Sequence, residues 1–191
     1  KTINGINRPA IATMFPTKKS ETVMLDLGAN IECDVKNILD FAIMGNIFSK
    51  TVLGVKKPKI GLLNVGSEIL KGNKIIQTAS DRLTKEKYID FYGFIEGNDI
   101  PMGLVDVVVT DGFTGNVALK TAEGTANFIT SELKQAMKSS ILSKLGSLIS
   151  MNSLKKFKKK LDPRLYNGAI LLGLDSPVIK SHGGTDYFGF S

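Results

Sequence analysis

The fold is decided by the stretch Val105-Asp106-Val107-Val108-Val109-Thr110-Asp111-Gly112-Phe113-Thr114-Gly115-Asn116, just past the middle of the chain. Its first part is an almost unbroken run of β-branched apolar residues, typical of a strand buried on both faces of a parallel sheet. Asp111 and Gly112 end this strand, and Gly115 permits a tight bend. After Asn116 an apolar residue recurs every three or four positions, which indicates a helix. The stretch therefore predicts a strand, a glycine-rich loop and a helix.

This loop is a candidate anion site. The start of a helix carries unpaired N–H groups and partial positive charge. Many such turns bind nothing, and the spacing is that of neither a Walker A loop nor a dinucleotide fingerprint. Two residues elsewhere are candidates for the same site. Lys71 follows a predicted strand and could hold a phosphate or polarise a carbonyl, although most loop lysines are only solvated. His182, the only histidine, precedes two glycines and could equally be a simple hydrogen-bond donor.

The rest of the chain alternates strands with helices. We predict strands at 8–15, 21–27, 58–65, 88–93, 167–174 and 176–181, the first and last pairs forming antiparallel hairpins, and helices at 33–50 and 75–85. This order predicts a single α/β domain over residues 1–191, Rossmann-like, with three layers (α/β/α) and a mostly parallel sheet. Ligands bind such sheets beyond the carboxyl ends of the strands, where we expect the loops 26–30, 64–73, 111–116 and 180–186.

Composition excludes several classes of protein. The 191 residues, 42% hydrophobic and 23% charged, are ordinary for a globular domain. Cys33 is the only cysteine, so no internal disulfide forms, and we expect it to be a buried structural thiol. No apolar run has the length of a transmembrane helix. No spacing of Cys, His and carboxylate residues suits a metal ion, and we expect neither a metal nor a cofactor. Both ends look cut, which predicts a fragment of a longer protein.

Residues 133–161 form a separate, basic segment. Eight lysines and no acid lie between 134 and 160, and without them 17 basic and 18 acidic residues remain, so the net charge of +7 belongs to this segment. Apolar residues, including Leu145 and Leu148, cluster in its middle. We predict a protruding helical hairpin with an apolar tip and basic flanks. A merely solvated helix pair explains the lysines but not the tip, which favours an acidic membrane surface, an acidic protein or a partner subunit. Nucleic acid is not expected, because arginine and aromatic residues are scarce there.

Several motifs resemble the PlsX family of bacterial phosphate acyltransferases. The residues that carry the resemblance span 106–120, 61–66, 71–73, 168–174, 180–183 and 8–10. The resemblance covers the whole chain, but the family's N-terminal portion and last helix are absent. It implies a fold like that of phosphate acetyltransferase and the isocitrate dehydrogenase group. It also implies a homodimer, and a bacterial cytoplasmic enzyme associated peripherally with the membrane.

The resemblance also implies a reaction. Inorganic phosphate attacks the thioester of a long-chain acyl–acyl carrier protein, which yields free carrier protein and an acyl phosphate for phospholipid synthesis. We expect Lys71 to orient phosphate and Asn116 to stabilise the oxyanion, although these two roles are interchangeable, and His182 to protonate the leaving thiolate. Phosphate or substrate contacts are expected at the loop residues Asn64, Gly66, Asp111, Gly112, Thr114, Gly115 and Lys180, with the backbone of 112–115 cradling the phosphate.

Two other functions stay open. One is a phosphate acetyl- or butyryltransferase that acts on coenzyme A thioesters, and the other is a non-catalytic membrane-associated scaffold. Within the acyltransferase hypothesis, the hairpin contacts the membrane or the carrier protein. We favour membrane contact for Leu145 and Leu148 at the tip, and docking of the acidic carrier protein on the basic flanks, at Lys155, Lys156, Lys159 and Arg164.

Overall fold

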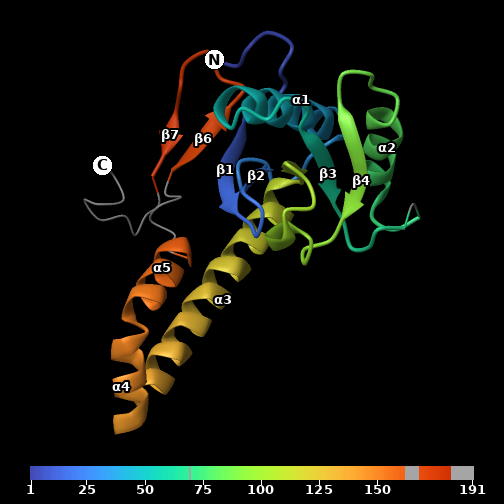
Figure 1. Ribbon diagram of the computed structural model, residues 1–191. Helices are drawn as coiled ribbons and strands as arrows, with labels where there is room; N and C mark the ends of the chain where they lie inside the picture. Colours follow the sequence, from blue (N-terminus) through green and yellow to red (C-terminus); the bar gives the residue numbers. More distant parts are fainter. Residues whose placement is uncertain (69, 162–167, 182–191) are drawn as a thin grey trace.

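The computed structural model describes residues 1–68, 70–161 and 168–181. Within these residues the chain forms one sheet of seven strands in the order β4-β3-β5-β2-β1-β6-β7 (Figure 1). Its strands are β1 Ala10–Pro16, β2 Glu21–Leu25, β3 Lys59–Leu63, β4 Asp90–Ile95, β5 Val107–Val109, β6 Ala169–Leu172 and β7 Ile179–Lys180.

Four adjacent strands form the parallel part of the sheet. β3 pairs in parallel with β4 and with β5, and β5 pairs in parallel with β2. The predicted hairpins are confirmed: β1 is antiparallel to β2, and β6 is antiparallel to β7. The carboxyl ends of β2, β3, β4 and β5 therefore share one edge of the sheet, which we call the loop edge. The opposite edge, where these strands begin, we call the amino edge.

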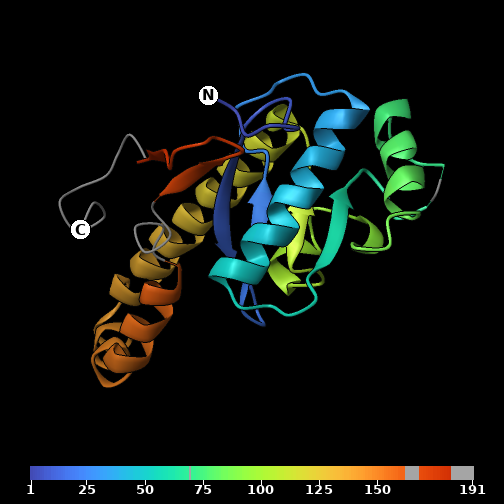
Figure 2. The same ribbon diagram turned by 90° about the horizontal axis from the view of Figure 1, so that it is seen from above.

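Two helices cover one face of the sheet. They are α1 (Val35–Val52) and α2 (Lys74–Leu83), and Figure 2 shows α1 lying across the strands. Each begins at a side-chain cap: the carboxylate of Asp34 accepts the N–H of Asn37, and the amide oxygen of Asn73 accepts the N–H of Ile76. Phe41 and Ile38 of α1 are fully buried against Ile60 and Val107 of the sheet, in the larger of two apolar clusters.

The other face carries a smaller core. Met24 and Val108 of the sheet pack there with Ile100 of the short 3₁₀ helix η1 (Ile100–Met102) and with Ala118 and Leu119. The last two belong to α3 (Gly112–Lys138), which begins directly after β5. This corrects the predicted glycine-rich loop: residues 112–116 form the first turn of the helix, because the Asp111 side chain caps it.

The predicted helical hairpin projects away from the sheet. The 27 residues of α3 extend over roughly 40 Å, α4 (Ile141–Ile149) packs at its far end, and α5 (Met151–Leu161) runs back toward the sheet (Figures 1 and 2). Among the described residues, no helix is both long and apolar enough to cross a bilayer.

Candidate functional site

The loop after β2 is built around a buried carboxylate. Asp26 is fully buried, and its Oδ1 accepts the N–H groups of Ile11 (2.9 Å) and Ala29 (3.1 Å). Its Oδ2 accepts the backbone N–H (2.7 Å) and the side-chain amide (2.8 Å) of Asn30. The same amide donates to the carbonyl of Pro9 at 2.8 Å. Four N–H donors thus satisfy the carboxylate and fix residues 26–30 at the loop edge.

The first turn of α3 packs on this loop through two glycines. A Cβ added at Gly112 would lie 2.6 Å from the Asn30 carbonyl oxygen, and one at Gly115 would overlap the Asp26 carbonyl oxygen. The N–H of Gly112 donates to the same Asn30 oxygen at 2.7 Å. Glycine is therefore required at both positions by the close approach of two backbones.

Three of the four N–H groups of the predicted backbone cradle for phosphate are already bonded within the protein. The N–H of Gly112 is bonded to Asn30, that of Thr114 donates to Asp111 Oδ1 at 2.8 Å, and that of Gly115 donates to the Asp111 carbonyl. The Thr114 hydroxyl also donates to Asp111 Oδ2 at 2.8 Å. Asp111 thus acts as a helix cap, and what the turn offers an anion is the positive end of the helix dipole.

Asn116 lies at the end of this first turn, exposed, against the loop after β2. A Cβ added at Gly28 would lie 3.7 Å from the Cβ and Cγ of Asn116. Gly28 has φ +121°, a conformation that disfavours other residues. The loop held by Asp26 therefore borders the Asn116 amide directly.

The loop after β3 is held by two amides. The Asn64 side-chain amide donates to the carbonyls of Gly66 (3.0 Å) and Lys71 (3.2 Å). From α2, the Gln77 amide donates to the carbonyl oxygens of Leu70 and Gly72, at 2.9 and 3.2 Å. Because both hydrogens of the Asn64 amide are used within the loop, its role here is to shape the loop rather than to bind phosphate.

Lys71 is exposed on this loop, and an acid accompanies it. A Cβ added at Gly66 would lie 2.7 Å from Glu68 Oε2 and 3.1 Å from Lys71 Cγ. Both side chains thus pass over the buried Gly66, where an added Cβ would displace the flexible end of Glu68. Gly66, which was predicted to contact phosphate, therefore has a packing role. The Glu68 carboxylate lies beside the Lys71 side chain.

The loop edge brings some predicted residues together and leaves out others. Lys71 lies on the loop after β3, which is the neighbour of β5 on one side. Asn116 follows β5 and lies against the loop after β2, which is the neighbour of β5 on the other side. The two residues therefore flank the end of β5. Lys180 ends β7, an edge strand separated from β5 by three strands and antiparallel to β6. At about 4.8 Å per strand, this is roughly 19 Å from β5, so Lys180 is not part of the site within one chain. His182 lies outside the described residues.

Cys33 sits close to the same turn. Its Sγ lies 3.6 Å from the Asn30 carbonyl oxygen, to which the thiol donates. Burial raises the pKa of the thiol to about 11, and the negative charges of Asp26 and Asp111 add to this, against the opposing hydrogen bond from the Gly112 backbone. A thiol with this pKa is protonated at neutral pH and is a poor nucleophile.

The loop 26–30 was predicted at this edge, but Asp26 and Asn30 were not among the predicted site residues. Their signal was available: Asp26-Leu27-Gly28-Ala29-Asn30 follows a predicted strand, and Asp and Asn commonly bond to nearby backbone. In the part of the chain that the structure describes, no three His, Cys, Asp or Glu side chains gather as a metal-binding group.

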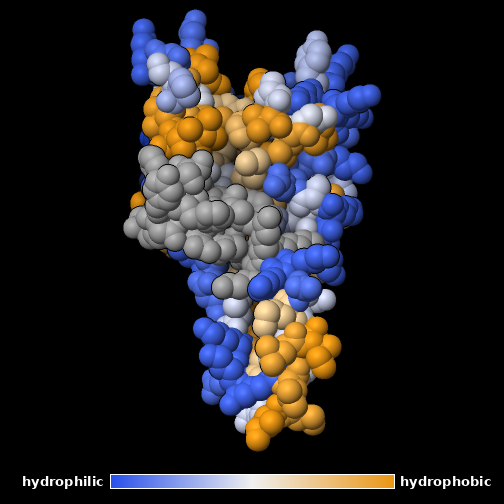
Figure 3. All heavy atoms as spheres, turned by 60° about the vertical axis from the view of Figure 1, so that its left-hand side comes forward, coloured by the Kyte–Doolittle hydropathy of each residue, from blue (hydrophilic) through white to orange (hydrophobic). Residues whose placement is uncertain are grey.

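The hairpin exposes the apolar residues predicted for its tip. Leu145 and Leu148 are 54% and 59% exposed, and Ile149 is 87% exposed. Figure 3 shows apolar side chains gathered at the far end of the projection beside a hydrophilic flank. Lys155 and Lys156 are exposed on α5. Lys159 belongs to α5, but its side chain lies outside the description, as does all of Arg164.

Comparison with solved structures confirms the predicted phosphate acetyltransferase-like fold. The EutD phosphotransacetylase from Staphylococcus aureus matches 97% of this chain and 52% of its own, with a TM-score of 0.56 and 17% identity. A phosphotransacetylase from Streptococcus pyogenes matches 65% of this chain and 44% of its own, with a TM-score of 0.53 and 16% identity. At such identities the likeness concerns the fold alone.

Sequence comparisons identify the family. The model of the fatty acid synthesis protein family matches residues 1–190. The phosphate acyltransferase of Pelagibacter ubique is 58% identical over 193 residues, which are 100% of this chain and 58% of the relative. That of Paramagnetospirillum magneticum is 57% identical over 188 residues, 98% of this chain and 54% of the relative. The chain thus spans somewhat more than half the length of these relatives. It belongs to the fatty acid synthesis protein family, together with these phosphate acyltransferases.

Proposed function

We propose that the protein containing this chain is a phosphate acyltransferase that converts a long-chain acyl–acyl carrier protein and inorganic phosphate into an acyl phosphate and free carrier protein. The single observation that supports this most is the placing of Lys71 and Asn116 on either side of the end of β5, beside the start of α3. An anion bound between them would meet the Lys71 cation, the Asn116 amide donor and the positive end of the α3 helix dipole.

The proposed reaction needs no covalent enzyme intermediate, because phosphate is itself a nucleophile. A phosphate oxygen attacks the thioester carbon, and the carbonyl oxygen becomes an oxyanion. Collapse of this intermediate breaks the C–S bond, and the thiolate leaves and takes up a proton. Lys71 orients the phosphate, Asn116 donates to the oxyanion, and His182 supplies the proton to sulfur. One oxyanion donor is worth about 3–4 kcal/mol of the barrier, and holding phosphate in line adds an orientation effect.

The test is turnover in a protein of the relatives' full length that carries this chain. Lys71→Ala and Asn116→Ala should each lower the rate of thiol release by tens-fold or more at saturating acyl carrier protein in phosphate buffer. Lys74→Ala and Asn127→Ala are matched controls: both residues are exposed, on α2 and α3, and their variants should retain the wild-type rate. Unchanged rates for both site variants would refute the assignment.

A parallel assay with acyl coenzyme A separates the remaining functions. Faster turnover of coenzyme A thioesters than of carrier thioesters would instead indicate a phosphate acetyl- or butyryltransferase. No release of thiol from either substrate would favour the third candidate function, the non-catalytic membrane-associated scaffold.

We further propose that the apolar tip of the hairpin contacts an anionic membrane at the cytoplasmic face, and that the lysines around it add about 1 kcal/mol each. The exposure of Leu145 and Leu148 supports this. Leu145→Glu with Leu148→Glu should abolish co-sedimentation with phosphatidylglycerol liposomes. Ser143→Glu with Ser147→Glu adds the same charge to α4 and should reduce sedimentation less. Retained binding of the leucine variant would show that the tip is not the anchor.

We also propose a homodimer. Phe113, Val117, Phe128 and Ile129 of α3 are 62%, 49%, 64% and 49% exposed, which is unusual for a single helix without a partner. Light scattering should give twice the chain mass, and Phe128→Glu with Ile129→Glu should reduce it. A monomeric wild type would contradict this proposal.

A further inference from the structure

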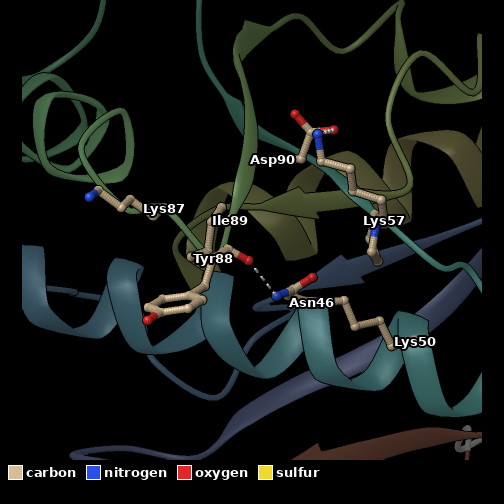
Figure 4. A pocket seen from close by; sticks show the side chains of 8 residues that line it. Asn46, Lys50, Lys57, Lys87, Tyr88, Ile89 and Asp90 are labelled. Atoms are coloured by element: carbon tan, nitrogen blue, oxygen red, sulfur yellow. Dashed lines mark hydrogen bonds and ion pairs between the residues drawn. The ribbon is translucent and has the colours of Figure 1, made fainter.

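A second group of lysines lies at the amino edge of the sheet, away from the hairpin. Lys50 lies in the last turn of α1, Lys57 precedes β3 and Lys87 precedes β4, and together they line a cavity of about 110 Å³. Figure 4 shows Lys50 and Lys87 on opposite sides of this cavity, with Lys57 extending to Asp90. Three further exposed lysines, Lys56, Lys59 and Lys85, are close to them in sequence.

Two acids near these lysines are engaged, whereas Glu86, between Lys85 and Lys87 in sequence, is exposed. Asp90 forms an ion pair with Lys57 at 3.4 Å, and the Asp106 carboxylate accepts the backbone N–H of Lys59 at 2.8 Å. Lys50 and Lys87 are exposed, and within the described part of the chain neither forms an ion pair. A count of charges along the sequence does not reveal this positive surface. The acids that balance these lysines in the count, such as Asp26, Glu68 and Asp111, lie at the loop edge.

A groove of about 660 Å³ lies along β4, and its lining shares no residue with the lysine cavity. Thr84, the residue after α2, and Phe91 line it toward the amino edge, and Ser67 and Asn98 line it at the loop edge. Ser67 belongs to the same loop as Lys71. The six residues of β4 cover roughly 20 Å, from Asp90 beside the lysine cavity to Ile95 at the loop edge.

The outer side of β4 offers backbone groups to a ligand in this groove. Among the described strands β4 is the last of the sheet, and β3 is its single partner. The Ile95 carbonyl accepts the N–H of Asn64 at 2.9 Å, so Ile95 faces β3. Because N–H and C=O groups alternate in direction along a strand, those of Phe94 point into the groove. A register shift in β4, with Gly93 at φ +116°, adds a bulge on the same side.

We infer that the acyl carrier protein docks on the lysines Lys50 and Lys87, and that its prosthetic arm lies along β4 with the thioester at the loop of Lys71. This rests on the proposed function. Carrier proteins are strongly acidic, which matches the lysine surface. The phosphopantetheine arm is a chain of about 15 atoms that, at the spacing of an extended polypeptide, spans roughly 18 Å. Its two amides can pair with an open strand edge, as an extended peptide does.

The arm's phosphodiester fits the lysine end of the groove. The cavity of about 110 Å³ has room for one phosphate group, and Lys50 and Lys87 are among the residues that line it. The arm then enters with its charge at the amino edge and delivers the uncharged thioester to the loop edge. On this proposal the hairpin lysines contact the membrane, which revises the expectation that they dock the carrier protein.

The experiment compares two charge reversals in the full-length protein. Lys50→Glu with Lys87→Glu should weaken the binding of labelled holo-carrier protein, measured by fluorescence anisotropy, and raise the KM for its acyl form, each by about tenfold or more. The same variant should leave the KM for a soluble acyl-pantetheine thioester unchanged, because that substrate lacks the carrier. Lys155→Glu with Lys156→Glu is the matched control on the hairpin and should change neither quantity.

A second pair of variants tests the groove. Ser80→Trp fills it from α2 and should raise the KM for acyl-pantetheine and acyl-carrier protein alike, whereas Thr78→Trp, on the same helix but outside the lining, should not. The inference fails if the hairpin reversal weakens carrier binding and the Lys50 and Lys87 reversal does not, or if Ser80→Trp leaves both KM values unchanged. If the Lys50 and Lys87 reversal weakens carrier binding as expected but the wild-type protein transfers no acyl group, the proposed function is refuted while the docking surface is supported.

Discussion

The backbone N–H of Gly112 donates a 2.7 Å hydrogen bond to the carbonyl oxygen of Asn30. This bond joins the first turn of the long helix α3 to the loop after β2. Because the Asp26 carboxylate holds that loop through four N–H donors, the position of Asn116 depends on a network that is buried beneath it.

The two glycines of this turn should not tolerate a side chain. We expect Gly112→Ala and Gly115→Ala each to destabilise the fold by about 1–3 kcal/mol, because a Cβ would press on the carbonyl oxygens of Asn30 and Asp26. Urea unfolding measures the effect. Gly124→Ala is the control in the same helix: nothing lies within 4 Å of its added Cβ, and alanine there should stabilise α3 by up to about 1 kcal/mol. Equal stabilities for all three variants would show that the turn does not pack as described.

The course of the chain could be predicted largely from its sequence. The β-branched run at 107–109 and the alternation of strands with helices follow from side-chain patterns that act locally. The start of α3 could not be predicted in this way. Gly112 and Gly115 look like a flexible loop in sequence, but tertiary contacts with Asp26 and Asn30 fix them as a helical turn.

The candidate site was predictable only in part. Lys71 and Asn116 were placed at the correct edge because parallel strands bring their carboxyl ends together. Lys180 lies away from these two residues within one chain, because its strand is antiparallel to β6 and stands at the far end of the sheet, and strand order cannot be read from the pattern of one strand. The lysines of the amino edge were missed because charges that cancel along the chain lie apart in space.

Asp26 should be essential for stability although it is no proposed ligand of the substrate. In Asp26→Asn an NH₂ group would face N–H donors and leave them unsatisfied in a fully buried position. We expect a loss of about 2–4 kcal/mol. Asp34→Asn is the matched control, because Asn is an equally good helix cap, and its free energy of unfolding should change by less than about 0.5 kcal/mol. A stable Asp26→Asn variant would contradict the described network.

The thiol of Cys33 should report on the packing of the same turn through its pH dependence. With a pKa of about 11 in the folded protein and an ordinary pKa of 9.0 for a cysteine thiol, the thiolate fraction at pH 8 is about a hundredfold smaller than in the unfolded chain. Alkylation by iodoacetamide, followed by mass spectrometry, should therefore be slow at pH 8 and rise about tenfold per pH unit until about pH 11. The protein unfolded in urea should instead reach its plateau near pH 9.

The same shift predicts the direction of a change in stability. Between pH 9 and 11 the unfolded chain has lost the Cys33 proton while the folded chain retains it, so the contribution of this group to stability is complete below pH 9 and declines above it. Cys33→Ser, whose hydroxyl does not ionise in this range, should remove that part of the alkaline loss. A labelling rate in the folded protein that levels off near pH 9 would mean that the thiol is solvated and that the loops around Asn30 and Gly112 are open in solution.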